Sequence, residues 1–467
     1  MASVEYVDVA IVGGGPAGSA AAHASASRGA CTLVLEKGVP RADRAGLGPD
    51  STDAGGILDY WVDIMGIHPD EIPVGIVQQK LDSATFIGPN TTCIVSNTRI
   101  DSSYDHFGYT FHRTRFDDWM RERAEAAGAE YWVGARVRNV QTDPDTRPTD
   151  NRPRHVLTVD SETTVGADFL ILADGPQRSI TNSVLDSYLP ENVRASDRLA
   201  SPRVNHIAYQ EYRRVPEAVF ETLRNTITFW WGVLPGRTAY PWIFPNRDRI
   251  CRVGLTMPIG LDIASVENRD QYELLRPEDD HIPTGGTYIR RLLEWQYGDE
   301  YDIERDFPLV KTAGKSDGTE TYPISSTRPI DSPVSAGIAV TGCAMGATSA
   351  FHEGGDHVAV RTGRIAGELA ATGDLSTYND RWKEAIGDEV LRNVTAADLV
   401  ESYGPLDWDH ILGAVDALLA SEAGGNIRAQ TVTASWDVTK LVFKYWRRKW
   451  RIQRRGYVQI HESEYTV

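Results

Sequence analysis

The sequence predicts an α/β protein in which a parallel-sheet domain is interleaved along the chain with a mixed-sheet domain and is followed by a helical C-terminal region. Three observations support this fold class. An apolar run at residues 6–12 leads into a glycine cluster and a small-residue helix, which is the pattern of a βαβ unit. From about residue 186 to residue 331, alternating strands carry most of the large aromatic side chains. Beyond residue 375 the periodicity is helical.

The first βαβ unit carries the glycine pattern GxGxxG of Rossmann-like dinucleotide-binding domains. Gly13 allows a tight turn after the strand, Gly15 lets a pyrophosphate approach the helix N-terminus, and Gly18 lets the helix pack closely on the strand. Ala17 belongs to the same turn. Glu36 ends the next strand, where its carboxylate can accept both ribose hydroxyls of an adenosine. A lone GxGxxG also arises by chance, but the flanking strand, helix and acid favour a dinucleotide site.

The chain is expected to leave this nucleotide-binding domain twice. In the first excursion, residues 76–86 and 92–97 form a hairpin that joins the second sheet, and residues 130–140 later return to the first sheet as one strand. The predicted nucleotide-binding domain comprises residues 1–75, 105–185 and 332–395, the substrate-binding domain residues 76–104 and 186–331, and the C-terminal helical region residues 396–467.

Composition excludes several classes of protein. The net charge of −17 and the isoelectric point of about 5.1 argue against a nucleic-acid partner. Four cysteines without CxxC spacing indicate neither a metal site nor a disulfide framework. The start of the chain has no basic segment followed by an apolar one, and no run of about 18 apolar residues occurs. The sequence therefore predicts a cytoplasmic protein.

Two later motifs resemble cofactor contacts. A buried strand at residues 167–173 ends in Asp174-Gly175, and a second glycine-rich stretch, from Gly342 to Gly355, leads into a helix that ends near residue 371. A helix N-terminus of this kind can receive an anion or a carbonyl oxygen. Close packing of the helix is the alternative explanation for its glycines.

Aromatic residues gather on two strands that a turn at residues 235–237 joins. In alternating strands such residues most often form ordinary core, but their density here also suits the lining of a long apolar cavity. The candidate substrate-binding residues are Trp230, Trp231, Tyr240, Trp242, Phe244 and Gly254.

Near the C-terminus, eight of the sixteen residues 440–455 are basic. On a helix, Val442, Tyr445, Trp446 and Trp450 are predicted to share one face, opposite most of the arginines. A basic helix with tryptophans suits an anionic membrane surface, so peripheral contact with the inner face of the cell membrane is one interpretation. A solvated helix that offsets the acidity of the chain is the other.

Four signatures in this order resemble the flavoproteins built like hydroxybenzoate hydroxylase: GxGxxG with its acid, RxxFD starting at Arg113, Asp174-Gly175, and the late glycine-rich helix. The resemblance implies FAD as cofactor, with its ADP half on the first βαβ unit and its flavin near Arg113 and the late helix. Besides the residues of the first unit, it implies cofactor contacts for Ala54, Gly56, Arg113, Asp174, Gly175, Cys343, Gly355 and Asp356.

Within that superfamily, Tyr240-Pro241-Trp242-Ile243-Phe244-Pro245, followed after eight residues by Gly254, looks like the YxWxFP-x8-GxG signature of geranylgeranyl reductases. Archaeal members of that family saturate the prenyl chains of ether lipids, and related members reduce the isoprenoid tail of menaquinone. The resemblance thus implies an FAD-dependent oxidoreductase acting on C=C bonds of a prenyl lipid. Its electron donor would be a ferredoxin, a reduced deazaflavin coenzyme or NADPH.

The chain departs from the family pattern at three places. Asp53-Ala54 stands where the family often has a cysteine, Cys343 stands where an aspartate usually meets the ribityl chain, and Thr256 replaces the second glycine of the signature. Without the cysteine, the candidate proton sources for saturation are Asp53, His352 and Asp356.

The sequence also allows two other hypotheses. Flavin halogenases carry a WxWxIP motif at a similar place, and residues 240–245 lack its first tryptophan and its isoleucine. A flavin-dependent monooxygenase or halogenase is therefore one alternative. The other is a non-catalytic flavoprotein that binds a prenyl lipid.

Overall fold

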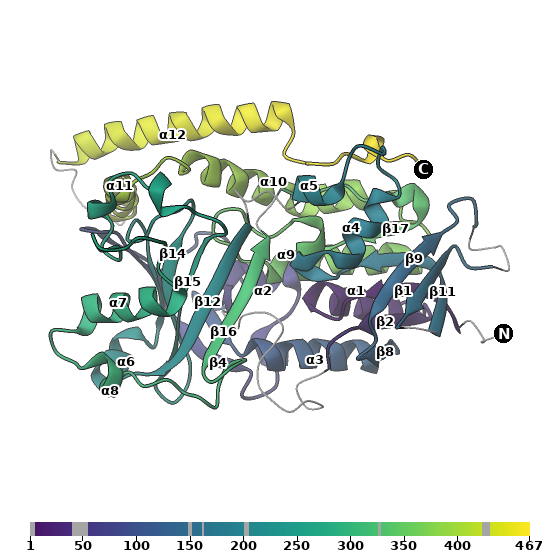
Figure 1. The fold of residues 1–467 in the computed structure, drawn as a ribbon, viewed down its shortest axis with the longest axis horizontal. Coiled ribbons are helices and arrows are strands. Elements are labelled where there is room, and N and C mark those ends of the chain that lie inside the picture. The colour runs from purple at the N-terminus through teal and green to yellow at the C-terminus, as the bar shows by residue number, and fades with distance from the viewer. Residues whose placement is uncertain are drawn as a thin grey trace.

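Residues 5–39, 55–147, 152–160, 163–199, 205–325, 328–422 and 430–467 are described by a computed structural model. Their strands form three sheets, of which the two larger lie side by side, with helices packed around them (Figure 1). Asp53 and Ala54 fall outside the described residues.

The first sheet has a parallel centre. Its strands run in the order β8-β2-β1-β11-β10-β9, and β17 pairs with the end of β11. Strands β1, β2, β8, β11 and β17 are parallel, whereas β10 and β9 are antiparallel additions. The almost continuous apolar sequences of the central strands follow from burial on both faces. The bounds are β1 Glu5–Val12, β2 Thr32–Glu36, β8 Glu130–Val133, β9 Val137–Thr142, β10 His155–Val159, β11 Thr163–Leu172 and β17 Ile338–Val340.

Helices α1 (Pro16–Ala26) and α9 (Asp356–Ala371) pack unusually closely against each other beside this sheet. A Cβ at Gly363 would lie 2.0 Å from the carbonyl oxygen of Ala17, and one at Gly367 would lie 2.2 Å from that of Ala21. The glycines of α9 therefore bring its N-terminus next to that of α1. Helix α3 (Arg113–Ala126) packs on α1, and α4 (Ser179–Asp186) and α5 (Ala195–Leu199) follow β11.

The second sheet is mixed, in the order β16-β12-β15-β14-β13-β5-β6, and only the β13–β5 pair is parallel. One face packs against α7 (Gly285–Tyr297) and neighbouring residues, while the other faces the first sheet and its helices. The strands are β5 Ser83–Ile87, β6 Thr92–Val95, β12 Asn205–Arg214, β13 Thr226–Trp230, β14 Tyr240–Pro245, β15 Ile250–Pro258 and β16 Thr319–Ser325. The flanking helices are α6 Glu217–Leu223 and α8 Ile303–Asp306.

A small antiparallel sheet, β3 (Gly56–Leu58), β7 (Gly108–Phe111) and β4 (Val77–Leu81), connects the two larger ones together with α2 (Asp59–Met65). The predicted hairpin at residues 76–97 thus divides: β4 joins this small sheet, and β5 and β6 form the edge of the second sheet.

The C-terminal region is helical, with α10 (Tyr378–Leu399), α11 (Pro405–Glu422) and α12 (Gln430–Arg455). Helix α12 runs along one side of the molecule, at the top of Figure 1. It packs on α10, where Arg448 forms an ion pair with Asp398 at 2.6 Å. Within the described ranges, no helix has the length and apolar character needed to cross a bilayer.

The prediction of one strand at residues 130–140 is wrong. Gly134 has a φ of +67°, and the chain turns there into two strands with different partners. β8 pairs with β2, and β9 pairs with β10. The left-handed backbone of a single glycine separates two runs that a pattern of alternating residues merges.

Candidate functional site

A cavity of about 1120 Å³ extends from the glycine turn of the first βαβ unit to the aromatic strands of the second sheet. Its wall includes Gly13, Arg113 and Gly355 at one end and Trp231 and Phe244 at the other. Pockets for a single small ligand are usually about 300–1,000 Å³. The cavity therefore has room for a large cofactor together with part of a substrate.

The glycine turn has the geometry that a dinucleotide needs. Gly13 has a φ of +101°, and a Cβ there would lie 2.4 Å from the carbonyl oxygen of Ala173. A Cβ at Gly18 would lie 1.9 Å from the carbonyl oxygen of Gly13, so only glycine allows this approach of helix and strand. Around Gly15, in contrast, no atom lies within 4 Å of the Cβ position. This open space is where a pyrophosphate group would meet the backbone N–H groups of α1.

Two further residues complete this end. Glu36 lines the cavity and accepts hydrogen bonds from the backbone N–H groups of Gly14 and Gly38, both at 2.6 Å. Ala17 lines the cavity at the start of α1, where α9 approaches it. The residues present therefore fit the ADP half of a dinucleotide.

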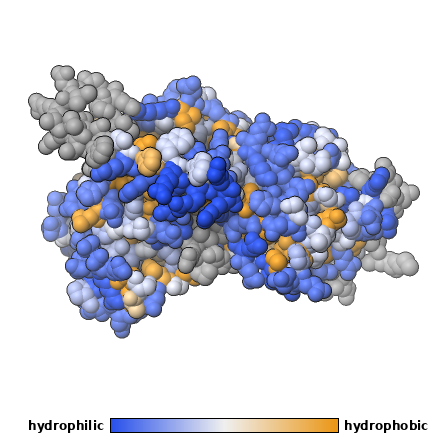
Figure 2. All heavy atoms as spheres, turned by 90° about the horizontal axis from the view of Figure 1, so that it is seen from above, coloured by the Kyte–Doolittle hydropathy of each residue, from blue (hydrophilic) through white to orange (hydrophobic). Residues whose placement is uncertain are grey.

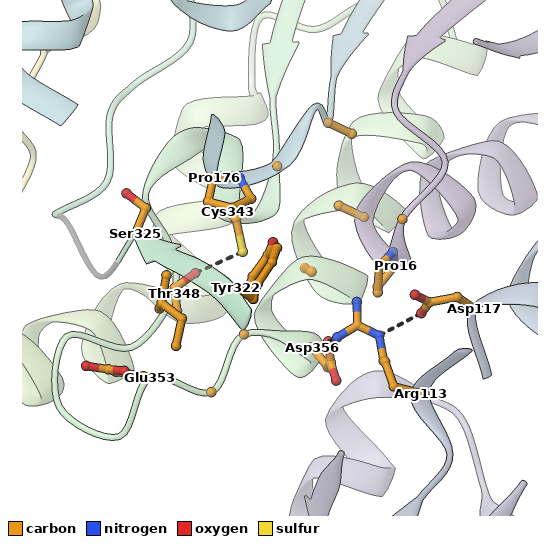
Figure 3. Close-up of a pocket in the computed structure, with 18 of the residues that line it drawn as sticks. Pro16, Arg113, Asp117, Pro176, Tyr322, Ser325, Cys343, Thr348, Glu353 and Asp356 are labelled. Atoms are coloured by element: carbon orange, nitrogen blue, oxygen red, sulfur yellow. Dashed lines mark hydrogen bonds and ion pairs between the residues drawn. The ribbon is translucent and has the colours of Figure 1, made fainter. Parts of the chain in front are cut away.

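Arg113 connects the first turns of two helices beside the cavity. Its Nε lies 2.7 Å from Asp117 on α3, and its Nη1 lies 2.9 Å from Asp356, the first residue of α9 (Figure 3). Burial lowers the pKa of Arg113, but the two carboxylates outweigh this effect and raise it overall. Burial also raises the pKa of Asp117 to about 6, against the effect of Arg113. The cluster fixes the N-terminus of α9 toward the cavity.

The Asp174-Gly175 turn lies on the cavity wall. The Asp174 carboxylate accepts hydrogen bonds from the backbone N–H groups of Ile180 and Thr181, at 2.8 and 3.1 Å, so it caps α4. Gly175, with a φ of +74°, turns the chain along the cavity. Both residues line the site, and the carboxylate is already used by the protein.

Arg178 supports the late glycine motif and was not predicted. Its buried guanidinium donates hydrogen bonds to the carbonyl oxygens of Cys343, Ala344 and Leu199, at 2.9, 2.9 and 3.0 Å. Burial lowers its pKa to about 10. It holds the turn after β17 in place. A lone arginine after a strand end gives no signal in the sequence, because its partners are backbone groups far along the chain.

Cys343 and Gly355 face each other across this turn. The Sγ of Cys343 lies 3.0 Å from Oγ1 of Thr348, and burial raises the pKa of its thiol (Figure 3). A Cβ at Gly355 would lie 3.4 Å from Thr348 Oγ1. Small side chains therefore leave the N-terminus of α9 accessible from the cavity.

An aromatic wall, which we define as Phe229, Trp231, Tyr240, Trp242 and Phe244, closes the other end. These side chains occupy alternate positions along two neighbouring stretches of chain. One is β13 with Trp231, the residue that follows it, and the other is β14, so the five side chains share one face of the sheet. The rings of Trp231 and Tyr240 stack with centroids 4.5 Å apart, and Trp231 also meets Trp408 of α11 at 4.4 Å. The wall gives the cavity an apolar surface that suits a hydrocarbon chain.

Two candidate substrate residues do not reach the cavity. Trp230, only 1% exposed, points to the opposite face of the sheet and packs with Val233 and Leu234, because neighbouring strand residues alternate. Gly254 lies behind the wall. A Cβ there would lie 2.5 Å from Cε2 of Trp242, so the glycine makes room for that ring.

Gly56 makes room for an aromatic ring, as Gly254 does. A Cβ at Gly56 would lie 2.8 Å from Cε1 of Phe244, so this residue lines the cavity next to the aromatic wall.

Comparison with known proteins identifies relatives over most of the chain. A Methanopyrus kandleri protein named digeranylgeranylglycerophospholipid reductase 2 is 27% identical over 426 residues, which cover 88% of this chain and 90% of that protein. Digeranylgeranylglycerophospholipid reductase 3 of Methanosphaera stadtmanae is 24% identical, covering 96% of this chain and 98% of its own length. The chain is thus similar over most of its length to proteins named digeranylgeranylglycerophospholipid reductase. No family model matches it.

Solved structures agree on the fold of this chain. A geranylgeranyl bacteriochlorophyll reductase-like protein from Thermoplasma acidophilum aligns with a TM-score of 0.66 at 19% identity, covering 97% of this chain and 100% of that one. The myxobacterial chondrochloren halogenase, an FAD-dependent halogenase, aligns with a TM-score of 0.56 at 17% identity, covering 90% and 91%. At these identities the likeness shows the fold alone.

The surroundings of His352 and Asp356 do not favour either residue as proton source. Burial lowers the pKa of His352 to about 4, and its Nδ1 accepts a hydrogen bond from the Gly354 N–H at 3.2 Å. Its ring is therefore neutral near pH 7. Asp356 is the ion-pair partner of Arg113. The acid between them, Glu353, also lines the cavity and was not predicted.

Proposed function

We propose that this chain is an FAD-dependent reductase that saturates double bonds of the geranylgeranyl chains of prenyl ether lipids. One observation carries the proposal: a single cavity joins a dinucleotide-binding turn to an aromatic wall. The names of the relatives supply the class of lipid. The assignment of the first sheet to cofactor binding and of the second to substrate binding belongs to the same proposal.

Each end of the cavity has a distinct task. When bound, FAD supplies a hydride in its reduced form. The N-terminus of α1 binds the pyrophosphate, Glu36 binds the ribose, and the Arg113 cluster with the N-terminus of α9 orients the remaining half. An isolated alkene offers no polar group to recognise. The aromatic wall therefore positions the chain by shape and excludes water from the reacting carbons.

We further propose that α12 rests on an anionic membrane surface. Its outward face exposes Val442, Phe443, Trp446 and Trp450, with exposed fractions of 46%, 68%, 59% and 55%. Figure 2 looks onto this side of the molecule, where strongly hydrophilic residues gather around scattered apolar ones. Apolar rings among basic residues are the composition of interfacial helices.

The predicted arrangement of that face needs correction. Tyr445 is only partly exposed, and burial raises the pKa of its hydroxyl against the effect of Arg392, a residue of the cavity wall. One arginine also departs from the predicted arrangement, since the Arg454 guanidinium lies 3.9 Å from the ring centroid of Trp450. The inward side of α12 thus adjoins the cavity wall, which supports lipid entry from this side.

Vesicle sedimentation tests the membrane contact. The variant Phe443→Ser/Trp446→Ser/Trp450→Ser is expected to lose binding to vesicles that contain anionic phospholipid, because it removes the apolar anchors. The control Leu406→Ser removes an exposed apolar residue of α11 instead. Equal binding of the triple variant and wild type would exclude this role of α12.

An anaerobic turnover assay tests the function. Purified protein with FAD, reduced by dithionite, is incubated with a digeranylgeranyl ether lipid, and mass spectrometry measures hydrogen added per double bond. One parallel sample contains menaquinone in place of the ether lipid. Another is supplied with oxygen and halide. Saturation of the ether lipid supports the proposal. Saturation of the menaquinone tail alone, or oxygen-dependent oxidation or halogenation without saturation, overturns it.

A further inference from the structure

Glu353 is held on the cavity wall by an unusual backbone. Its φ is +58°, a left-handed value that is rare for a residue with a side chain and is often found at functional positions. The surrounding loop is well connected, since the Glu353 N–H donates to the carbonyl oxygen of Ser349 at 3.1 Å. In Figure 3, Glu353 lies on the loop before α9, away from the Arg113 and Asp356 pair. The loop therefore presents a separate acid to the cavity.

The carboxyl group has partners on two strands of the second sheet. Oγ1 of Thr256 on β15 donates to Oε2 at 2.5 Å, and Oε1 lies 3.2 Å from Nδ1 of His206 on β12. All three side chains are buried. Tyr240 is also near, but its hydroxyl donates to the carbonyl oxygen of His352 at 2.6 Å.

The contact of Nε2, the other ring nitrogen of His206, shows which nitrogen of this ring carries a hydrogen. Nε2 lies 2.8 Å from the carbonyl oxygen of Arg237. A carbonyl oxygen only accepts, so Nε2 carries a hydrogen. In the neutral ring, Nδ1 is then an acceptor that faces Glu353. The pair can thus hold one proton without net charge, on the wall of an apolar cavity.

We propose that Glu353 donates the proton that completes the saturation of the alkene, with Thr256 and His206 as its positioning residues. This inference rests on the proposed function. It assigns a role to Thr256, which stands where the reductase signature has glycine, in a chain that has aspartate at position 53 where the family often has cysteine.

The step balances in atoms and electrons. One alkene carbon receives the hydride that reduced FAD supplies, and the π electron pair of the double bond forms a C–H bond between the other carbon and the proton of Glu353. The alkene gains two electrons with the hydride, which the reduced flavin, as its anion FADH−, would supply to leave FAD. Glu353 is left as a carboxylate, and it regains a proton from water before the next turnover.

The electrostatics agree with this geometry. Burial raises the pKa of Glu353, while His206 and Thr256 oppose this effect. A carboxyl group with a raised pKa retains its proton closer to neutral pH, which a general acid requires. His352, in contrast, is neutral, and Asp356 is paired with Arg113.

Infrared spectroscopy of the protein without cofactor tests the state of the pair. The wild type should show the C=O band of a protonated carboxyl group above the pH range in which glutamate ordinarily titrates. That band should be absent from Glu353→Gln and present in Glu320→Gln, in which another buried glutamate of the second sheet, outside the cavity wall, is changed. A wild type without the band, or a band that Glu353→Gln retains, overturns the proposal.

Anaerobic single-turnover kinetics test the step itself. Glu353→Gln is expected to slow hydrogenation of the geranylgeranyl lipid by about 100-fold or more, with FAD affinity unchanged, whereas Glu320→Gln keeps the wild-type rate. If the Glu353→Gln rate equals that of wild type, the role of Glu353 as proton donor is overturned, while the proposed function still stands. Absence of turnover in the wild type overturns the proposed function instead, while the infrared result still stands.

The pH profile of Thr256→Val tests the positioning residues and does not depend on the folding of Glu353→Gln. Removal of the hydrogen bond from Thr256 destabilises the Glu353 carboxylate, so its pKa rises. The decline of the hydrogenation rate at high pH should therefore move to higher pH. An unchanged profile contradicts the positioning role.

Discussion

Replacing Gly254 by alanine should push Trp242 into the cavity and weaken lipid binding. The two residues are paired on adjacent strands, and Gln210 on β12 lies on the other side of Gly254. A Cβ at position 254 would lie 2.5 and 2.6 Å from Cε2 and Cζ2 of Trp242 and 2.7 Å from Cβ of Gln210. The new methyl group is therefore enclosed between two side chains on neighbouring strands.

The magnitude follows from these distances. Carbon atoms pack at about 3.5–4.0 Å, so the indole must move by about 1 Å. Overpacking of this kind costs about 1–3 kcal/mol of folding free energy. The ring can move into open space, because Trp242 already lines the cavity. We expect the displaced ring to weaken lipid binding by about tenfold, or about 1.4 kcal/mol.

Two measurements check this prediction. Urea unfolding, followed by circular dichroism, gives the change in stability, and titration with a geranylgeranyl lipid gives the change in affinity, while FAD affinity should stay unchanged. Gly413→Ala on α11 is the control, because the nearest atom to its Cβ would be 3.9 Å away. Equal lipid affinity of Gly254→Ala and wild type would refute the argument that Gly254 seats Trp242.

Three other predictions follow from single residues. Trp231→Leu removes stacking in the aromatic wall and should raise KM for the lipid. Trp230→Leu should lower the free energy of unfolding and leave KM unchanged. Equal KM values for the two variants would contradict the assignment of these residues to opposite faces of the sheet. Arg178→Met should lower the free energy of unfolding by about 2–5 kcal/mol, because it removes three hydrogen bonds from a buried guanidinium to backbone carbonyl oxygens, and urea unfolding measures this loss. Burial lowers the pKa of His155 to about 3, so its contribution to stability is present above about pH 6.5 and falls by up to about 1.4 kcal/mol per pH unit below it. Thermal unfolding between pH 7 and pH 5 should therefore show a weaker pH dependence for His155→Gln than for wild type, and parallel curves would contradict this.

The cofactor end of the site could be predicted from the sequence because it is built from local motifs. Gly13 and Gly18 are required by contacts within a few residues or between adjacent elements, so their spacing carries the information. The same holds for the order of Arg113 and the late glycine helix. The pairing of Arg113 with Asp356 could not be predicted from the sequence, because it joins two helices whose first residues are far apart in the chain.

The substrate end was less predictable. Aromatic composition indicated a lined cavity, but the face of each residue depends on the strand register. Trp230 and Trp231 are neighbours in sequence, and the pairing of Phe229 with Trp242 places Trp231 in the wall and Trp230 in the opposite core. A shift of one residue would exchange their positions.

By itself, the sequence determined the fold class, the dinucleotide turn and the likeness to prenyl reductases, because each depends on residue types at short, fixed spacing. Only the tertiary structure placed Glu353 among the acids that line the cavity. Glu353 lies between His352 and Gly354 without a motif of its own, and its partners Thr256 and His206 come from two strands of another sheet. The pair of Glu353 and His206, to which we assign this proton, forms where the loop before α9 meets β12 and β15, since burial and close contact, rather than spacing, give a carboxyl group this character.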